Sequence, residues 1–417
     1  MGADAFAYRG FMLDSARHFM PPENIRKLLD AAQALGLNVM HWHLTDDQGW
    51  RLEIRKYPRL TEVGAVRGDS CFGDVSATEN NCGFYTQEEV RDLVAYAAER
   101  GIGILPEIEL PGHATALLAA CPEYGCTAED GGRWENRVET TGGIFAALVC
   151  AGKDETLRFI RDVMDEAVSL FPYPAVHIGG DEALKIRWRR CRDCQRRIRE
   201  LGLASEDGLQ RWLVLETGGY LAAKGRKTVV WNDVLAGGML PEHFIVQHWM
   251  GNDGETRAFM EAGGSVICSD TAAYYLDYPY GQTDVKKMWA YPTVPAWAEG
   301  LEDRLLGLEC PLWTERISSL ERAAYMLFPR LCAMSVKASR PEGTDWPAFL
   351  AGVRKLQQKT DALGLRGAPE SLWELSEEEA ARDRLSWEEQ NRTEATRAQI
   401  EQERRLVEQD RAEREAR

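Results

Sequence analysis

The sequence predicts an α/β protein folded as a (β/α)8 TIM barrel with a C-terminal charged helical extension. Apolar, β-branched runs alternate with segments of helical period to about residue 338, a pattern typical of repeated βα units and a parallel sheet. Eight such runs occur, the number that closes a TIM barrel, a fold of about 250 residues that grows by loop insertions. Polar and aromatic residues close almost every run, as expected where the strand ends build an active site.

The predicted strands are residues 10–17, 38–44, 103–110, 175–182, 227–233, 243–249, 264–270 and 304–310. Between the first strands, a helix over 22–36 has Pro in its first turn and Gly36 as its stop, and a helix over 86–101 begins with a capping box of Thr86 and Glu89. An open, doubly wound sheet is the alternative fold. No strand-to-helix turn carries the G-x-G-x-x-G pattern, so nothing supports dinucleotide binding, and no cofactor is expected.

The composition narrows the class of protein and of partner. A chain of 417 residues with 44% hydrophobic residues can bury a large core. The net charge of −16 argues against a nucleic-acid partner, because such binding depends on clustered Lys and Arg. No window approaches the ~18 apolar residues of a membrane span and no leader is visible, so we expect a cytoplasmic protein without a membrane partner, unless a leader has been removed. The oligomeric state stays open, with a homodimer as one option.

Ten cysteines are scattered along the chain, unlike the dense framework of a small secreted domain, and we expect most to be reduced. The pair in "CRDC", Cys191 and Cys194, has the spacing of half a zinc knuckle. No second Cys or His pair follows at a matching distance, and no H-E-x-x-H spacing occurs. We therefore expect two thiols on one helical face and no metal site, with a metal or redox role as the weaker alternative.

The composition changes towards the C-terminus. We expect the catalytic barrel to span residues 1–340 and a helical segment to span residues 341–417, ending in a charge-rich tail that faces solvent. The sparse apolar positions Leu385, Ile400 and Leu406 do not keep heptad register. A helix that lies on the barrel or frays is therefore favoured over a coiled coil.

Two adjacent carboxylates, Asp181 and Glu182, directly follow the apolar run that ends in "HIGG". Successive side chains of a strand point to opposite faces, so both carboxylates can reach one pocket only where the strand breaks into a loop. Gly179 and Gly180 allow such a break. Two close carboxylates push their pKa values apart, so that one stays protonated while the other is ionised, and this division of labour is the basis of glycoside hydrolysis.

Tryptophans end several of the predicted strands. For each of Trp231, Trp249 and Trp313 alone, core packing is the better interpretation. Together, beside carboxylates at a barrel mouth, they are typical of a sugar pocket, where flat apolar faces stack on C–H groups and polar side chains bind hydroxyls. Histidines inside the strands, such as His41, His43 and His177, we expect to be hydrogen-bonding groups of the barrel interior.

Seven ordered motifs resemble the β-N-acetylhexosaminidases of glycoside hydrolase family 20. They are "MLDSARHFMP", "HWHLTDDQGWRLEIRKYPRL", "PEIELPGHA", "HIGGDE", "VVWNDV", "YYLDYP" and "LWTE", which together cover roughly residues 9 to 335. The family is an exception to the scheme with two catalytic carboxylates, because the substrate assists its own hydrolysis. Many members carry a further domain ahead of the barrel, so the resemblance implies a barrel-only form, since the first strand begins near residue 9.

The resemblance implies a retaining exo-glycosidase that removes terminal non-reducing β-linked N-acetylglucosamine or N-acetylgalactosamine from a glycan or glycoconjugate through an oxazolinium intermediate. Glu182 would be the general acid and base. Asp181 would orient the 2-acetamido group, and Tyr275 would hydrogen-bond its oxygen. Asp46 and His113 would form a relay behind Glu182. The implied substrate-binding side chains are the walls Trp231, Trp249 and Trp313, and the hydroxyl-binding groups Arg17, Asp277 and Glu315.

Plainer roles remain open for two of these residues, since Arg17 can pair with Asp14 and His113 can be an ordinary loop histidine. Rival functions also remain. A lacto-N-biosidase or a hexosaminidase for sulfated or polymeric N-acetylglucosamine would need a wider pocket, and a non-catalytic sugar-binding barrel would not need the intact carboxylate pair. The loops over 67–85 and 280–300 match no recognised pattern, and we expect them to set the linkage preference.

Overall fold

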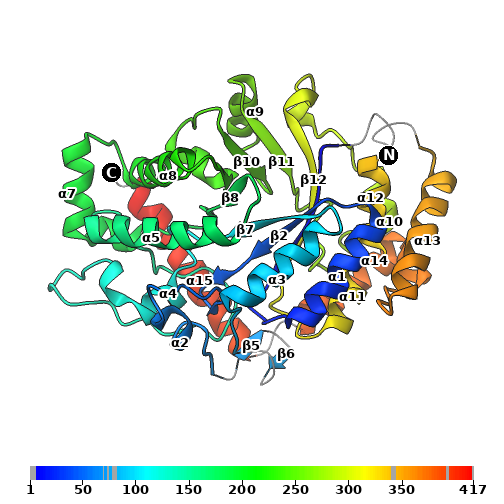
Figure 1. The fold of residues 1–417 in the computed structure, drawn as a ribbon, viewed down its shortest axis with the longest axis horizontal. Coiled ribbons are helices and arrows are strands. Elements are labelled where there is room, and N and C mark those ends of the chain that lie inside the picture. The colour runs from blue at the N-terminus through cyan, green and yellow to red at the C-terminus, as the bar shows by residue number, and fades with distance from the viewer. Residues whose placement is uncertain are drawn as a thin grey trace.

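The computed structural model describes residues 6–68, 70–72, 75–77, 82–339, 344–390 and 394–415. Eight parallel strands close into a barrel in which β12 pairs with β1 (Figure 1). They are β1 (Tyr8–Asp14), β2 (Val39–His43), β7 (Gly103–Glu107), β8 (Ala175–His177), β9 (Lys227–Trp231), β10 (Phe244–His248), β11 (Ser265–Cys268) and β12 (Leu305–Leu312). Each overlaps one of the eight apolar runs, so the predicted TIM barrel is confirmed.

Helices surround this barrel. The longer ones that follow the strands are α1 (Pro22–Leu35), α3 (Gln87–Ala98), α5 (Asp154–Leu170), α8 (Glu206–Ala223), α9 (Asp253–Glu261) and α12 (Arg330–Ser339). The predicted helix signals are present, because α1 ends at Gly36 with φ 77° and both bonds of the Thr86–Glu89 capping box form at the start of α3. Further elements lie in the loops: β3 (Thr45–Asp46), β4 (Gly49–Trp50), β5 (Ser70–Phe72), β6 (Val75–Ala77), α2 (Arg59–Glu62), α4 (Thr115–Ala120), α6 (Ile186–Arg190), α7 (Arg192–Leu201), α10 (Val285–Ala290) and α11 (Leu320–Leu327).

Some strands end earlier than their apolar runs. The run over 175–182 contributes only three residues to β8, and β1 ends three residues before its run does. Gly179 and Gly180 have φ values of 65° and 109°, which an extended strand cannot hold. The remaining residues of these runs therefore form the βα loops, where a TIM barrel builds its site.

The barrel interior has an apolar layer towards the amino ends of the strands and a polar layer above it. In the polar layer, His41 lies 2.9 Å from Glu309 and 3.1 Å from Glu107, and His177 lies 2.8 Å from Glu107. His43 also hydrogen-bonds Glu107, so the interior role predicted for the three histidines is confirmed. The apolar layer consists of Tyr8, Val39, Leu105, Ala175, Val229, Ile245 and Ile267.

The C-terminal extension forms three further helices, α13 (Trp346–Ala362), α14 (Glu377–Gln390) and α15 (Glu394–Glu415). α13 packs against α12 and α1, and α15 runs from β5 to α6 (Figure 1). The tail thus lies on the barrel, one of the two arrangements favoured by its sequence. The proposed boundary at residue 340 lies outside the described residues, and the division into two units stays a prediction. Within the described ranges, no helix is both long and apolar enough to cross a bilayer.

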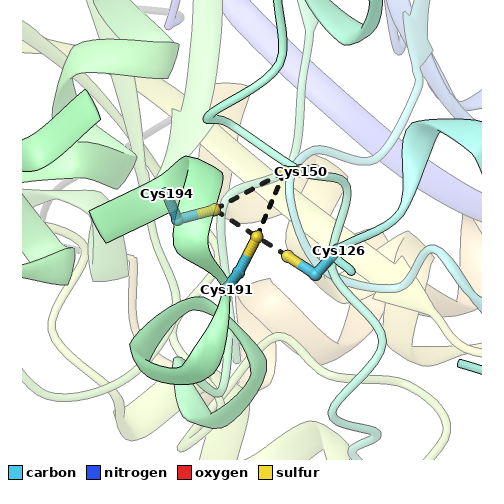
Figure 2. Close-up of side chains that lie close together, drawn as sticks. All are labelled: Cys126, Cys150, Cys191 and Cys194. Atoms are coloured by element: carbon cyan, nitrogen blue, oxygen red, sulfur yellow. Dashed lines mark hydrogen bonds between the residues drawn. The ribbon is translucent and has the colours of Figure 1, made fainter. Parts of the chain in front are cut away.

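The nine cysteines whose side chains the structure describes are all free, as expected for reduced thiols. Cys191 directly precedes α7, and Cys194 lies in its first turn. Both sulfurs meet those of Cys126 and Cys150 in a buried cluster (Figure 2). The "CRDC" pair is therefore more than two thiols on one helical face.

Candidate active site

A cavity of about 170 Å³ opens at the carboxyl ends of the barrel strands. Every lining residue except Tyr278 is one that the sequence predicts for the site. Two other predicted residues lie behind the lining, Asp46 against Arg17 and Trp231 beside Trp313. The lining consists of Arg17, His113, Asp181, Glu182, Trp249, Tyr275, Asp277, Tyr278, Trp313 and Glu315.

The loop after β8 turns sharply and brings Asp181 and Glu182 to the cavity. Gly179, Gly180 and Glu182 all have positive φ values, and Glu182 at 48° is strained, as is common for residues of active sites. Packing gives a second reason for the first glycine, because a Cβ there would lie 1.7 Å from Oε2 of Glu109. The two glycines thus allow both the turn and the close approach of a buried carboxyl group.

We expect Gly179→Ala to lower the free energy of unfolding by ~2 kcal/mol or more, since the new methyl group meets Glu109 at a backbone angle that alanine rarely adopts. Denaturant unfolding measures the change. Gly219→Ala is the matched control, because that helical glycine of α8 has open space around its Cβ position and should tolerate alanine without loss. Equal stability of the two variants would contradict the packing described here.

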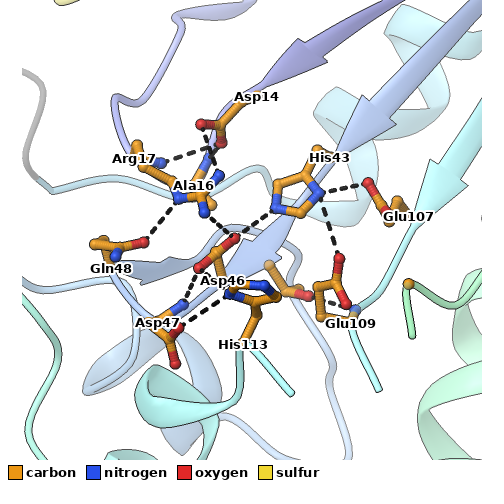
Figure 3. A network of polar contacts seen from close by, with 12 residues as sticks. Asp14, Ala16, Arg17, His43, Asp46, Asp47, Gln48, Glu107, Glu109 and His113 are labelled. Atoms are coloured by element: carbon orange, nitrogen blue, oxygen red, sulfur yellow. Dashed lines mark hydrogen bonds and ion pairs between the residues drawn. The ribbon is translucent and has the colours of Figure 1, made fainter. Parts of the chain in front are cut away.

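His113 connects the carboxylate pair to two acidic residues beneath it. Its Nε2 lies 3.5 Å from Oδ2 of Asp181 and 3.6 Å from Oε2 of Glu182. On the other side of the ring, Nδ1 lies 3.1 Å from Asp47 and 3.3 Å from Asp46 (Figure 3). The structure therefore brings together the predicted relay of Asp46 and His113 behind Glu182. Asp47 is a second anchor, and sequence reasoning missed it beside its neighbour.

Burial and neighbouring carboxylates favour the protonated form of Glu182. Burial raises the pKa of Glu182 to about 8, and the charges of Asp181 and Asp233 add to this rise while His113 opposes it. Burial also disfavours a charge on His113, but Asp46 and hydrogen bonds to its carboxylate neighbours raise the pKa of His113 well above its ordinary value. These shifts favour the protonated form of Glu182 at neutral pH and the protonated form of His113.

Asp181 and Tyr275 offer complementary groups to an amide. Oδ1 of Asp181 is buried and has no hydrogen-bond partner among the residues that the structure describes. Such an orphaned acceptor costs free energy unless a ligand donates to it. Burial raises the pKa of Tyr275 well above its ordinary value, so the hydroxyl stays protonated and can donate. One cavity thus presents an acceptor for an amide N–H and a donor for an amide oxygen.

Arg17 is held rigidly at the edge of the cavity. Its guanidinium lies 2.7 Å from Asp46 and 3.4 Å from Asp14, and its Nε donates to Gln48 at 2.8 Å (Figure 3). The pairing with Asp14 therefore exists, but it is the longer of the two. A third carboxylate, Glu315, lies 4.0 Å away on the cavity wall and is 31% exposed. Arg17 and Glu315 together present a donor and an acceptor, as sugar hydroxyls require.

Aromatic rings wall the rest of the cavity. Trp249 stacks near Tyr275 at 6.0 Å between ring centroids, and its Nε1 donates to Asp233 at 2.7 Å. Trp313 lies 6.5 Å from Tyr275, and the buried Trp231 lies 6.2 Å behind Trp313. Four aromatic residues, Trp249, Tyr275, Tyr278 and Trp313, thus face the ligand space, whereas Trp231 supports Trp313 from behind. Asp233 ends one of the predicted strands, in the motif "VVWNDV", but the sequence analysis assigned it no role in the site.

A second cavity adjoins the first, and the C-terminal extension forms one of its walls. Asp277 belongs to both cavities, and burial followed by the charge of Glu315 raises the pKa of Asp277 to about 7. The charge of Glu403 on α15 also raises the pKa of Glu182. No sequence signal ties these segments together, because only the packing of α15 on the barrel does so. The residues of the extension that line this cavity are Trp387, Thr396, Gln399, Ile400 and Glu403.

Comparison with known proteins agrees with this geometry. The profile of "Glycosyl hydrolase family 20, catalytic domain" matches residues 6–338. A beta-hexosaminidase of Porphyromonas gingivalis is 40% identical over 343 residues, which are 79% of this chain and 43% of that protein. A beta-hexosaminidase of Vibrio furnissii is 33% identical over 350 residues, 80% of this chain and 56% of that protein. The chain therefore spans about half the length of these two relatives.

Solved structures show the same relationship. A beta-N-acetylhexosaminidase from Bacteroides fragilis superimposes with a TM-score of 0.75 at 32% identity, covering 87% of this chain and 73% of that one. An exo beta-N-acetylglucosaminidase from Vibrio harveyi, solved in complex with N-acetylglucosamine, gives a TM-score of 0.76 at 30% identity, covering 88% and 60% of the two chains. By its matching profile, its relatives and its fold, the chain belongs to glycosyl hydrolase family 20.

Proposed function

We propose that this protein is a retaining β-N-acetylhexosaminidase that removes terminal non-reducing β-linked N-acetylglucosamine or N-acetylgalactosamine with the help of the substrate's own acetamido group. The observation that carries the proposal is the carboxylate pair. Asp181 and Glu182 lie on one side of an aromatic cavity and both approach a single nitrogen of His113. The names of the relatives support the same activity.

The spacing of the pair supports retention without a protein nucleophile. Carboxylate oxygens of Asp181 and Glu182 lie within 4.8 Å of each other, whereas an inverting pair needs about 6.5–9.5 Å to hold a water molecule. A nucleophile must also attack the sugar ring from the face opposite the leaving group. Two carboxylates that share one imidazole nitrogen on one side of the cavity do not flank the ring in this way, so we assign the attack to the substrate.

The proposed reaction then assigns each proton. Glu182 gives its proton to the leaving oxygen while the acetamido carbonyl oxygen attacks the anomeric carbon, forming the oxazolinium. Asp181 accepts the amide N–H and stabilises the positive charge, and Tyr275 donates to the acetamido oxygen. Glu182 then takes a proton from water, whose oxygen attacks the anomeric carbon and reopens the ring with net retention. Arg17 and the carboxylates near it bind the outer hydroxyls.

The second cavity supports a second candidate specificity, for a larger or substituted sugar. It begins at Asp277 and Glu315, the groups proposed to bind outer hydroxyls, and extends towards Gln399 and Glu403 of α15. A substituent or a further sugar beyond the first ring can enter this space. A lacto-N-biosidase, or a hexosaminidase acting on sulfated or polymeric N-acetylglucosamine, is therefore the second candidate.

The test compares aryl glycosides. We expect release of the aryl group from β-N-acetylglucosaminide and β-N-acetylgalactosaminide, and a rate at least ~100-fold lower for the matched β-glucoside, which lacks the attacking amide and the groups that Asp181 and Tyr275 recognise. Nuclear magnetic resonance of the first-formed product reports retention. Preference for a 6-sulfated aryl sugar or an aryl disaccharide would select the second candidate. Binding of N-acetylglucosamine without any hydrolysis of the aryl glycosides would exclude both enzymatic candidates and select the non-catalytic sugar-binding barrel.

A further inference from the structure

Four cysteines from three separate stretches of chain meet in one buried cluster beside the active-site loops. Cys126 and Cys150 lie in the long connection between α4 and α5, and Cys191 and Cys194 lie at the amino end of α7 (Figure 2). The relative exposure of each residue is 4% or less. The sulfur atoms are 3.6 Å apart for Cys150 and Cys194, 3.7 Å for Cys150 and Cys191, and 3.8 Å for Cys126 and Cys194.

These distances are those of a tetrahedral metal site. Zinc bound to four thiolates has Zn–S bonds of about 2.3 Å, which place the corners of the tetrahedron about 3.8 Å apart. A disulfide would need sulfurs about 2.05 Å apart, and all four cysteines are free. One ligand atom from each of the four lies within 4.8 Å of all the others, so a single ion can reach them together.

The backbone around the cluster is built for close approach. The segment after Cys150 packs directly on the "CRDC" turn, since a Cβ on Gly152 would lie 2.1 Å from the carbonyl carbon of Asp193. The backbone N–H of Cys150 donates to Tyr124 at 2.7 Å, and Arg197 donates to the carbonyl of Gly152 at 3.3 Å. Backbone and side-chain contacts outside the cluster thus hold the thiols in place.

Cationic side chains lie close to the cluster. A zinc ion with four thiolates carries a net charge of −2, which favours nearby cations. The "CRDC" turn lies in the Arg-rich stretch over 186–197.

We propose that Cys126, Cys150, Cys191 and Cys194 bind one structural zinc ion. Binding displaces the four thiol protons to solvent and forms four Zn–S bonds, which leaves no open position for water or substrate. The tetrahedral arrangement of soft ligands favours zinc over magnesium, calcium or manganese. The sequence analysis predicts no metal site. The structure does not test that prediction, but the geometry of the four thiols argues against it.

The site cross-links the two loops that carry the catalytic groups. The backbone N–H of Val149 donates to Pro111 at 3.0 Å, two residues before His113. The carbonyl of Val149 in turn accepts from Nε1 of Trp188 at 2.9 Å, in the segment that continues from Glu182. The ion would therefore fix the long loop after β7 against the loop after β8, and it would stabilise the fold around His113 without touching the substrate.

Metal analysis tests the proposal without any assay of activity. Wild-type protein should be purified under reducing conditions without chelators. Elemental mass spectrometry of this protein should then find one zinc ion per chain. Cys150→Ala should lower that content at least ~10-fold and lower Tm, because binding of the ion stabilises the folded chain. The matched control is Cys121→Ala, since Cys121 is also buried and lies in the same connection but outside the cluster, and its zinc content should equal that of wild type.

Three results would overturn the proposal. The first is a wild-type protein that contains no zinc and takes up none when it is reduced and titrated with Zn²⁺. The others are iron in place of zinc, or an equal zinc content in Cys150→Ala and wild type. Should Cys150→Ala fail to fold, X-ray absorption of the wild-type protein decides instead. Four sulfur ligands at about 2.3 Å support the site, and oxygen or nitrogen ligands exclude it. The outcome is independent of the proposed glycosidase activity.

Discussion

Replacing Glu182 with Gln should lower kcat for an aryl β-N-acetylglucosaminide with a poor leaving group by ~100-fold or more. This is the size of effect expected when a general acid is removed, and Gln cannot donate the proton that Glu182 holds at neutral pH. The loss should shrink for a substrate whose leaving group needs no protonation. Steady-state kinetics on the two substrates measures the contrast. Glu408→Gln is the control, because Glu408 lies on α15 with its side chain 64% exposed and should leave kcat unchanged.

The pH dependence follows from the same group. Burial raises the pKa of Glu182 to about 8, and the acid acts only in its protonated form. Wild-type kcat/KM should therefore hold up to about pH 8 and fall at higher pH as the proton is lost, whereas the Gln variant should lose this alkaline limb. Near-wild-type activity of Glu182→Gln on the poor leaving group, or an unchanged alkaline limb, would show that another group is the acid.

Asp181→Asn should also lower kcat by ~100-fold or more, but with a different dependence on substrate. Asp181 is proposed to accept the amide N–H and to stabilise charge on the forming oxazolinium, and the loss of one such group typically costs about 10²–10³ in rate. Its buried Oδ1 has no partner among the described residues, so the amide is the donor we expect it to meet. Because the acetamido oxygen displaces the leaving group in one step, whatever that group is, an activated leaving group should not rescue this variant.

Inhibition by a thiazoline mimic of the oxazolinium provides a second measurement for Asp181→Asn. The mimic should inhibit wild type and bind the variant much more weakly, since it presents the same bicyclic geometry as the intermediate and a ring nitrogen at the position that Asp181 is proposed to contact. Asp253→Asn is the control for loss of a carboxylate, because the Asp253 side chain is 66% exposed. Rescue of Asp181→Asn by an activated leaving group, together with no inhibition of wild type, would instead favour a carboxylate nucleophile on the protein.

Much of the barrel could be predicted because its strands are buried on both faces. Runs such as "KTVVWND" and "HFIVQHW" are continuous and β-branched, so the positions of β9 and β10 are visible without knowledge of their neighbours. The end of β8 was less visible. The apolar run continues through Ile178, and only the φ values of Gly179 and Gly180 show that the chain has already left the strand.

The candidate site was also visible in part, because parallel strands bring their carboxyl ends to one side of a barrel. Polar residues at those ends, such as Arg17, Asp181 and Glu315, were therefore bound to lie near one another. Residues in the supporting layer were harder to identify. Asp47 and Asp233 look like ordinary loop acids, and their contacts with His113 and Trp249 depend on side-chain directions that no local pattern encodes.

The amino-acid sequence by itself determined the eight strands, the carboxylate pair behind two glycines, and the family motifs, because each of these depends on neighbouring residues or on short ordered patterns. Only the tertiary structure decided which distant groups meet. The "CRDC" pair has no partners after it. Its partners precede it across helix α5, since Cys126 lies 68 residues before Cys194 and Cys150 lies 41 residues before Cys191. Likewise, the charged α15 reaches the active-site mouth only because the closed barrel offers it a surface, since long-range contacts of this kind arise from packing in three dimensions.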